Sequence, residues 1–314
     1  MSYGRSASWI GIAVAALNGI ASAQLAVPVP EFNLEKLELD PFAVGSLVVG
    51  SGRLLAPGAL RISAVVNYQR KPLLIRLDSQ STAAVVRDRL ATHVTLGLGL
   101  LPRLNFGAEL PIVVGQTSDD LSATGFAPPA RRGLGTPVLT ARGAVLQDPL
   151  GEALDLAVEL RVGLPVGNGD ALAGNSGATV SPRLLASKQI NPVLVSLEAG
   201  ALLRSKLMIG TQELGNQLMF GAALSTLSPT RAEISWRSSI SLTGLPAAHE
   251  LLGGGRVGFG PGLQLFAVGG PGFGASLGSP AFRILVGFAW GMEPSPAPSA
   301  QADDVCQPGR SHLP

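Results

Sequence analysis

Charged side chains recur at alternating positions along this chain, and arginine is the commonest of them. Around Asp155, Glu159 and Arg161, for example, every second residue is apolar. Successive side chains of an extended chain point to opposite faces, so the charges share one face and the apolar residues share the other. The charged set that this spacing collects comprises Arg61, Arg87, Arg89, His93, Glu109, Arg142, Asp155, Glu159, Arg161, Arg183, Glu198, Arg204, Arg231, Glu233, Arg237, Arg256 and Arg283. We predict that these residues face the lumen of a barrel.

Two kinds of chemistry are open to such a set. Arginines and carboxylates on neighbouring strands can pair into a network that fills the interior, which would make the barrel a structural scaffold with at most passive pore activity. Alternatively, the excess of arginine lines a narrow water-filled passage that favours anions. We favour the first hypothesis. The second describes a substrate-selective channel for small anions or hydrophobic nutrients.

Catalysis finds little support in the same residues. A Ser-His pair that acts on lipid, as in outer-membrane phospholipases, needs a lipid-facing wall, whereas the alternation places His93 on the inner face. A lipid hydrolase is therefore the third hypothesis. The glycine clusters at 253–255 and 269–274 lack the strand-to-helix context of a phosphate-binding loop, and Asp119 and Asp120 are typical of a solvated loop. We expect no enzymatic activity, no cofactor and no bound metal.

The elements that position these residues follow a period of two. The stretch from Val94 to Val113 is predicted to form two strands joined by a tight turn at Pro102 and Arg103. One face of both strands is continuously apolar, and the other carries glycines, an amide and one carboxylate, which is typical of a barrel strand between lipid and lumen. The chain is only 14% charged, with a mean hydropathy of +0.35. Past the N-terminus no apolar run approaches the roughly 18 residues of a spanning helix, which leaves a closed barrel.

The sequence therefore predicts an all-β fold, a transmembrane antiparallel up-and-down β-barrel of about 12 strands over residues 59–291. The predicted strands cover roughly 59–68, 87–101, 104–113, 136–146, 154–164, 178–188, 193–203, 218–224, 231–240, 249–259, 262–269 and 282–290. Short and long connections alternate, with longer segments at 69–85, 116–135, 166–177 and 206–216. Outer-membrane barrels have this asymmetry, with short turns on the periplasmic side.

The remaining segments flank the barrel. Residues 1–23 are predicted to be a signal peptide, because an apolar run is followed by Ala21-Ser22-Ala23. In residues 24–58 the apolar side chains follow neither the two-residue period of a strand nor the 3.6-residue period of a helix. We therefore predict a periplasmic lead-in or a segment that tucks into the barrel mouth. Residues 292–314, which contain Cys306, are predicted to be a disordered tail.

Several stretches resemble the barrel regions of OmpA-family outer-membrane proteins from myxobacteria. They lie between Leu37 and Ile75, including Leu47–Gly50 and Tyr68–Leu73, in the strand pair ending Glu109-Leu110-Pro111, and in Ser279–Leu285. The resemblance implies a barrel in the outer membrane of a Gram-negative bacterium, with the lipid bilayer as its partner and small solutes or ions as candidate cargo.

In that group, calcium-binding repeats and a peptidoglycan-binding domain often follow the barrel. Asp303-Asp304-Val305-Cys306 is similar to the start of such a repeat. No residues match the peptidoglycan-binding domain, so we expect no binding to peptidoglycan. The net charge of +2 argues against a nucleic-acid partner.

Overall fold

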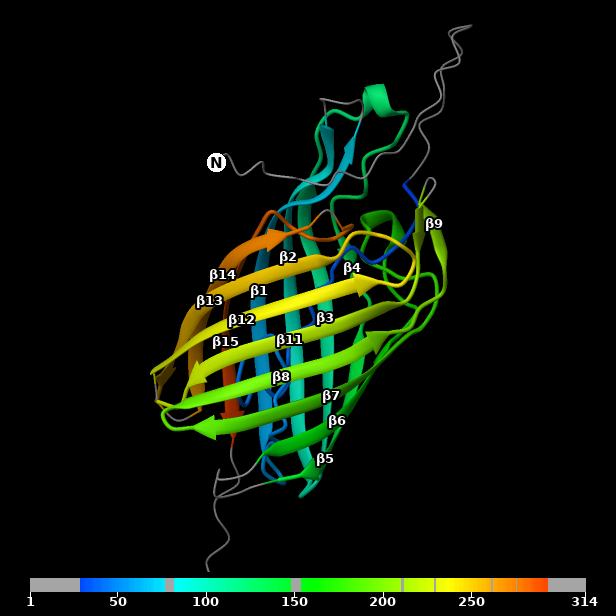
Figure 1. Cartoon of the computed structure of the whole chain (residues 1–314). Helices are drawn as coiled ribbons and strands as arrows, with labels where there is room; N and C mark the ends of the chain where they lie inside the picture. Colours follow the sequence, from blue (N-terminus) through cyan, green and yellow to red (C-terminus); the bar gives the residue numbers. More distant parts are fainter. Residues whose placement is uncertain are drawn as a thin grey trace, which may run out of the picture.

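Twelve long antiparallel strands close into a barrel (Figure 1). The computed structural model describes residues 29–76, 82–147, 154–209, 212–228, 230–260, 262–274 and 276–292. The barrel strands are β1 (Leu60–Arg76), β2 (Thr82–Leu101), β3 (Leu104–Thr117), β5 (Val138–Leu146), β6 (Asp155–Gly163), β7 (Thr179–Ile190), β8 (Val193–Leu202), β11 (Gln217–Thr226), β12 (Thr230–Ser241), β13 (Ala248–Phe259), β14 (Leu263–Phe273) and β15 (Phe282–Met292). Each pairs with the next, and β1 pairs with β15 to close the ring. The predicted fold is confirmed.

The two ends of the barrel differ. One end carries the long connections, with the small strand β4 (Gly133–Leu134), the hairpin of β9 (Leu207–Ile209) and β10 (Gln212–Leu214), and the short 3-10 helices η1 (Ser122–Thr124) and η2 (Gly169–Ala171). The other end carries short connections, such as the two residues between β2 and β3. We call these the long-loop end and the short-turn end. In outer-membrane barrels the long loops face the cell exterior.

Side chains alternate between the inside and the outside of the barrel. On β6, Asp155, Glu159 and Arg161 are buried inside, whereas Val158 and Leu160 are 50% and 45% exposed on the outer wall. The other strands repeat this pattern, so large apolar residues form a belt around the outside. An apolar outer face on every strand is what a barrel in lipid requires. Among the described residues, no helix is long and apolar enough to cross a membrane.

Several strands run farther than the sequence predicts. Residues 69–85, predicted as a loop, belong mostly to β1 and β2, which extend past their neighbours as a hairpin at the long-loop end (Figure 1). Register shifts between Arg70 and Leu74 break the alternation of this stretch, so its period did not reveal a strand. The predicted loop at 206–216 contains the β9–β10 hairpin, and the strand predicted at 262–269 continues as β14.

Residues 29–58, which we call the plug, run through the interior of the barrel. Figure 1 shows this segment in dark blue, beginning beside β9 at the long-loop end and continuing inside the ring of strands. Phe32 and Leu34 pack among the long connections, and the N–H of Gly58 donates to the carbonyl oxygen of Gly99 on β2 at the short-turn end. A periplasmic lead-in therefore does not describe these residues. Their apolar side chains are buried against the wall, which removes them from water.

Three other predicted segments lie outside the described residues. They are the signal peptide at 1–23, the turn around 148–152, and the tail from residue 293 onward. Their predicted roles stay predictions.

Two hydrophobic clusters hold the plug. At the long-loop end, Phe32 and Leu34 join side chains of β1, β2 and the long connections in a cap over the lumen. Deeper inside, apolar plug residues pack against inward-facing residues of β1, β13, β14 and β15. The plug contributes Leu37, Leu39, Leu47, Val48 and Val49, and the wall contributes Val65, Leu252, Phe266, Val268, Leu285 and Ala289. Full burial of one such side chain stabilises by about 1.5–3 kcal/mol, so apolar packing favours the closed lumen.

Candidate functional site

The plug alternates apolar and acidic residues where it crosses the middle of the barrel. Leu37 and Leu39 are buried in the cluster against β13, β14 and β15. Glu38 and Asp40, each one position further on, reach arginines of β5, β6 and β7. Neighbouring side chains of an extended chain point to opposite sides. The plug therefore lies between an apolar wall and an arginine-rich wall.

Arg142 of β5 is the centre of the arginine-rich wall. Its guanidinium donates to Asp40 of the plug at 2.8 and 3.3 Å and to Glu159 of β6 at 2.5 and 2.8 Å. It also lies 4.5 Å from the ring centroid of Phe42. All three charged side chains are fully buried. Loss of one partner from such a group leaves an uncompensated buried charge, so Asp40 fastens the plug to β5.

Two further arginines share Glu38 of the plug. Arg183 of β7 forms an ion pair with Glu38 Oε2, and Arg161 of β6 approaches the same oxygen at 3.4 Å. Arg161 also pairs with Glu159 at 2.7 Å, so Glu159 bridges Arg142 and Arg161. One ionic network therefore joins three adjacent strands to the plug.

A second network surrounds Glu35 nearer the long-loop end. Arg283 of β15 lies 2.9 Å from Glu35 and 3.0 Å from Glu250 of β13. His93 of β2 is fully buried, with Nδ1 2.7 Å from Glu109 of β3 and Nε2 3.8 Å from Glu35. Glu35 thus links the plug to β2 and β15, on the opposite side of the ring from β7.

Toward the short-turn end, wall charges bind mainly the plug backbone. Glu233 of β12 accepts a hydrogen bond from the N–H of Leu47 at 3.2 Å, and Glu198 of β8 accepts one from the N–H of Gly50 at 2.8 Å. Arg256 of β13 donates to two carbonyl oxygens of the plug. These bonds satisfy the backbone of a segment that lies outside any strand ladder.

Most of the residues predicted to line the lumen do face the interior. They are Arg61, Arg89, His93, Glu109, Arg142, Asp155, Glu159, Arg161, Arg183, Glu198, Arg231, Glu233, Arg237, Arg256 and Arg283. Arg87 instead is half exposed beyond the rim of the barrel, where it pairs with Asp88 and Asp119. Arg204 lies two residues beyond the end of β8 at the long-loop end, where it lines a small interior cavity. Alternation misplaced Arg87 because it does not reveal where a strand leaves the ring.

The interior charges are closer to balance than the sequence predicts. Of the predicted residues that face the interior from the barrel strands, nine are arginines and five are carboxylates. Glu250 of β13 is a sixth interior carboxylate, which the prediction missed. The plug adds the carboxylates Glu35, Glu38 and Asp40, and also a lysine and an arginine. The expected excess of arginine is therefore much smaller in the closed barrel.

One signal of the plug is present in the sequence. The inner face of the first strand pair carries glycines, and the plug occupies the space that they leave. A Cβ atom on Gly97 of β2 would lie 2.6 Å from the carbonyl oxygen of Pro41, and one on Gly107 of β3 would lie 2.7 Å from the Pro41 ring. Both glycines are needed because the plug backbone passes so close to the wall.

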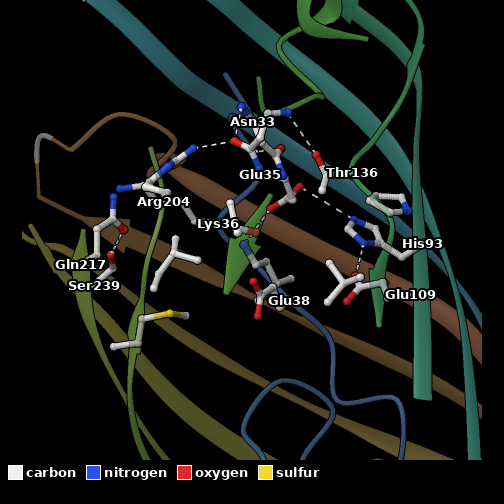
Figure 2. Close-up of a pocket in the computed structure, with 17 residues that line it drawn as sticks. Asn33, Glu35, Lys36, Glu38, His93, Glu109, Thr136, Arg204, Gln217 and Ser239 are labelled. Carbon is white, nitrogen blue, oxygen red and sulfur yellow. Dashed lines mark hydrogen bonds and ion pairs between the residues drawn. The ribbon is translucent and has the colours of Figure 1, made fainter. Parts of the chain in front are cut away.

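A small cavity remains between the plug and the wall near the long-loop end (Figure 2). Its volume is about 60 Å³. The polar side chains around it include Asn33, Glu35, Lys36 and Glu38 of the plug and His93, Glu109, Arg204, Gln217 and Ser239 of the barrel and its connections. One water molecule needs about 10–15 Å³ on this measure, so the cavity holds a few waters or one small ion.

The outer wall carries an apolar groove over β5, β6 and β7. Its volume is about 600 Å³. Its apolar lining comprises Leu104, Ala141, Gly143, Val158, Leu160, Pro182 and Leu184, and the inward-facing residues Glu159 and Arg183 also border it. The groove forms because β5 presents the small residues Ala141 and Gly143 between larger neighbours. An apolar chain or ring is the kind of ligand that such a surface fits.

The structure does not assemble a Ser-His nucleophile at the two histidines that it describes. His93 is buried in the interior beside Glu109, away from lipid. Ser238 of β12 and His249 of β13 face each other in register, and the His249 ring stacks on Trp236. Within the described part of the chain, however, neither Ser238 Oγ nor His249 Nδ1 has a hydrogen-bond partner. A hydrolytic serine needs a hydrogen bond to its base.

The fold is similar to those of solved outer-membrane channels and porins. The COG4313 outer membrane channel from Pseudomonas putida F1 matches with a TM-score of 0.60 and 15% identity, over 77% of this chain and 98% of that chain. The KdgM porin matches with a TM-score of 0.45 and 8% identity, over 73% of this chain and 98% of its own. The CymD monoaromatic hydrocarbon channel matches with a TM-score of 0.42 and 10% identity, over 82% and 98%. No family model matches the chain, and no curated protein matches it by sequence.

At these identities the likeness establishes the fold alone. The closed ring of strands and the apolar belt add the physical argument, because in lipid every backbone polar group must be paired within the protein. The protein is an integral β-barrel of the outer membrane, and its outer wall contacts the lipid bilayer.

Proposed function

We propose that this protein is an outer-membrane channel for small solutes and that the plug closes its lumen. The way in which the plug is attached carries the proposal. Among the described residues, backbone-to-backbone hydrogen bonds join the plug to the rest of the chain only near its two ends, through Leu34 and Gly58. Every other polar contact between plug and wall involves a side chain. The strand ladders are complete without the plug, so it can move while the barrel stays closed as a ring.

The dimensions of the barrel support the same proposal. Twelve strands enclose more space than the eight that side chains alone can fill, and less than the 16 to 18 of a general porin. A segment of the chain fills that space here. The COG4313 protein is itself named an outer membrane channel. Membership of the OmpA family, which the sequence resembles, stays a prediction.

A reversible cross-link between plug and wall tests the proposal. A Cβ atom on Gly45 of the plug would lie 3.2 Å from Ser196 Oγ on β8, which suits a disulfide between cysteines at these positions once the flexible end of Leu194, 2.9 Å from that Cβ, shifts aside. The variant Gly45→Cys/Ser196→Cys is made with Cys306→Ser, which removes the only native cysteine. In planar bilayers we expect no openings of the oxidised protein and discrete openings after reduction.

The single variants Gly45→Cys and Ser196→Cys are the matched controls, and reductant should not change their conductance. If the reduced double variant and the unmodified protein both fail to conduct, the channel proposal is wrong. The barrel then serves as the structural scaffold that the sequence favours.

The groove on the outer wall favours a second candidate function, the uptake of a hydrophobic solute from the bilayer. Gly143→Trp should fill the groove between β5 and β6, because a Cβ atom at Gly143 meets Val158 only at 3.8 Å. We expect this variant to slow the transfer of an apolar fluorescent probe into liposomes. Val66→Trp, on the outer wall of β1, is the control. Equal rates for both variants would exclude the groove as an entry site.

A further inference from the structure

The cavity beside Lys36 has the donors of an anion site, and we propose that it binds a small free oxyanion such as sulfate. Lys36 of the plug and Arg204 of the segment after β8 both line it (Figure 2). Lys36 Nζ donates to Ser276 Oγ at 2.6 Å, and Arg204 Nη2 donates to Asn175 Oδ1 at 2.6 Å. An ammonium has three N–H donors and a guanidinium has five, so each cation keeps donors for a ligand.

Neither cation has a carboxylate partner. Among the ion pairs of the described residues, Lys36 and Arg204 do not occur. The carboxylates around the cavity are engaged by other side chains. Glu35 binds Arg283, Glu38 binds two arginines of the wall, and Glu109 binds His93. Two cations therefore face the same small space without an ion-pair partner of their own, and an anion would supply one.

Neutral donors complete the site. The hydroxyl of Ser239 on β12 donates to Oε1 of Gln217 on β11 at 2.5 Å. This bond fixes which side of the Gln217 amide carries the oxygen and which carries the NH₂ group. Figure 2 shows Gln217 beside Arg204, with its nitrogen on the Arg204 side. The Gln217 NH₂ group and the Arg204 guanidinium, which can only donate hydrogen bonds, thus lie next to each other. The oxygens of an oxyanion can accept from both.

The size of the cavity selects the ligand. About 60 Å³ is the space of roughly four water molecules, and a second cavity of about 30 Å³ adjoins it at Lys36 and Met219. Sulfate fits this space, whereas a phosphorylated sugar does not. The site therefore takes a free ion and not the charged group of a larger solute.

The environment of Lys36 agrees with a missing counter-charge. Lys36 lies outside the membrane-spanning strands, beside the connection that holds Ser276. Burial, and secondarily the charge of Arg204, lowers its pKa to about 7, and Glu250 opposes this change. Arg237 of β12 also faces Lys36 across the smaller cavity. A bound anion would favour the charged form of Lys36.

Calorimetric titration of the detergent-solubilised protein with sodium sulfate, in a gluconate background of constant ionic strength at pH 6.5, tests the site. We expect saturable binding by the unmodified protein. Lys36→Met and Arg204→Gln should each weaken it about tenfold or more, because each removes a charge-assisted donor. Lys36→Arg should retain it. Lys206→Met is the matched control, since Lys206 is exposed and pairs with Glu213 on the β9–β10 hairpin.

Absence of saturable binding by the unmodified protein, or equal binding by Lys36→Met, Arg204→Gln and Lys206→Met, would overturn the proposal. Binding of glucose 6-phosphate as tight as that of sulfate would overturn the assignment to a free ion. If Lys36→Met fails to fold, Arg204→Gln decides on its own. The titration needs no open channel, so its result is independent of the conductance experiment on the cross-linked plug.

Discussion

Asp40→Asn should loosen the plug without disturbing the barrel. Asp40 accepts two bonds from the Arg142 guanidinium, at 2.8 and 3.3 Å, and both side chains are fully buried. A hydrogen bond to a charged group contributes about 1.5–3 kcal/mol. Arg142 keeps Glu159 as a partner. We therefore expect the closed state to lose about 2–3 kcal/mol, which shifts the ratio of open to closed channels roughly 30- to 160-fold.

The measurement is the fraction of time that single channels spend open in planar bilayers. Glu31→Gln is the matched control, because Glu31 belongs to the same plug but is exposed. Resistance of the folded barrel to detergent should be the same for both variants, since Asp40 belongs to no strand. An open fraction for Asp40→Asn within about threefold of the unmodified protein, in a barrel that is folded, would refute the idea that the Asp40–Arg142 pair holds the plug closed.

Three further predictions concern the plug, the oxyanion site and the lipid face. Gly97→Val should displace the plug and increase channel openings, because its Cβ atom would meet the Pro41 carbonyl at 2.6 Å; unchanged conductance would show that the plug does not pass there. Sulfate affinity should fall as the pH rises through about 7, because Lys36 must be protonated to bind; a flat calorimetric profile from pH 6 to 8 would contradict this. Val158→Arg on the outer wall should destabilise the barrel by about 2–4 kcal/mol in denaturant titrations, and Val166→Arg, beyond the end of β6, by about 0–1 kcal/mol; equal losses would place both residues at the same depth.

The sequence by itself determined the wall of the barrel. Period two is a local property, so the alternation of Val158 and Leu160 with Glu159 and Arg161 could be assigned without knowledge of any neighbour. The apolar face of every strand then required lipid outside, and the low charge content agreed with it. For the same reason, most of the charged residues predicted to face the lumen do face the interior.

Only the tertiary structure decided what lies inside the ring. Apart from the short run at residues 37–40, the plug has no period that predicts burial, because its residues bond to side chains from strands throughout the barrel and not to one neighbouring strand. Asp40, for example, meets Arg142 102 positions along the chain, and Arg283 meets Glu35 across 248 positions. Contacts at such separations depend on closure of the whole ring. The closed lumen and the oxyanion cavity therefore follow from where the barrel brings these residues together, which alternation along a single strand does not encode.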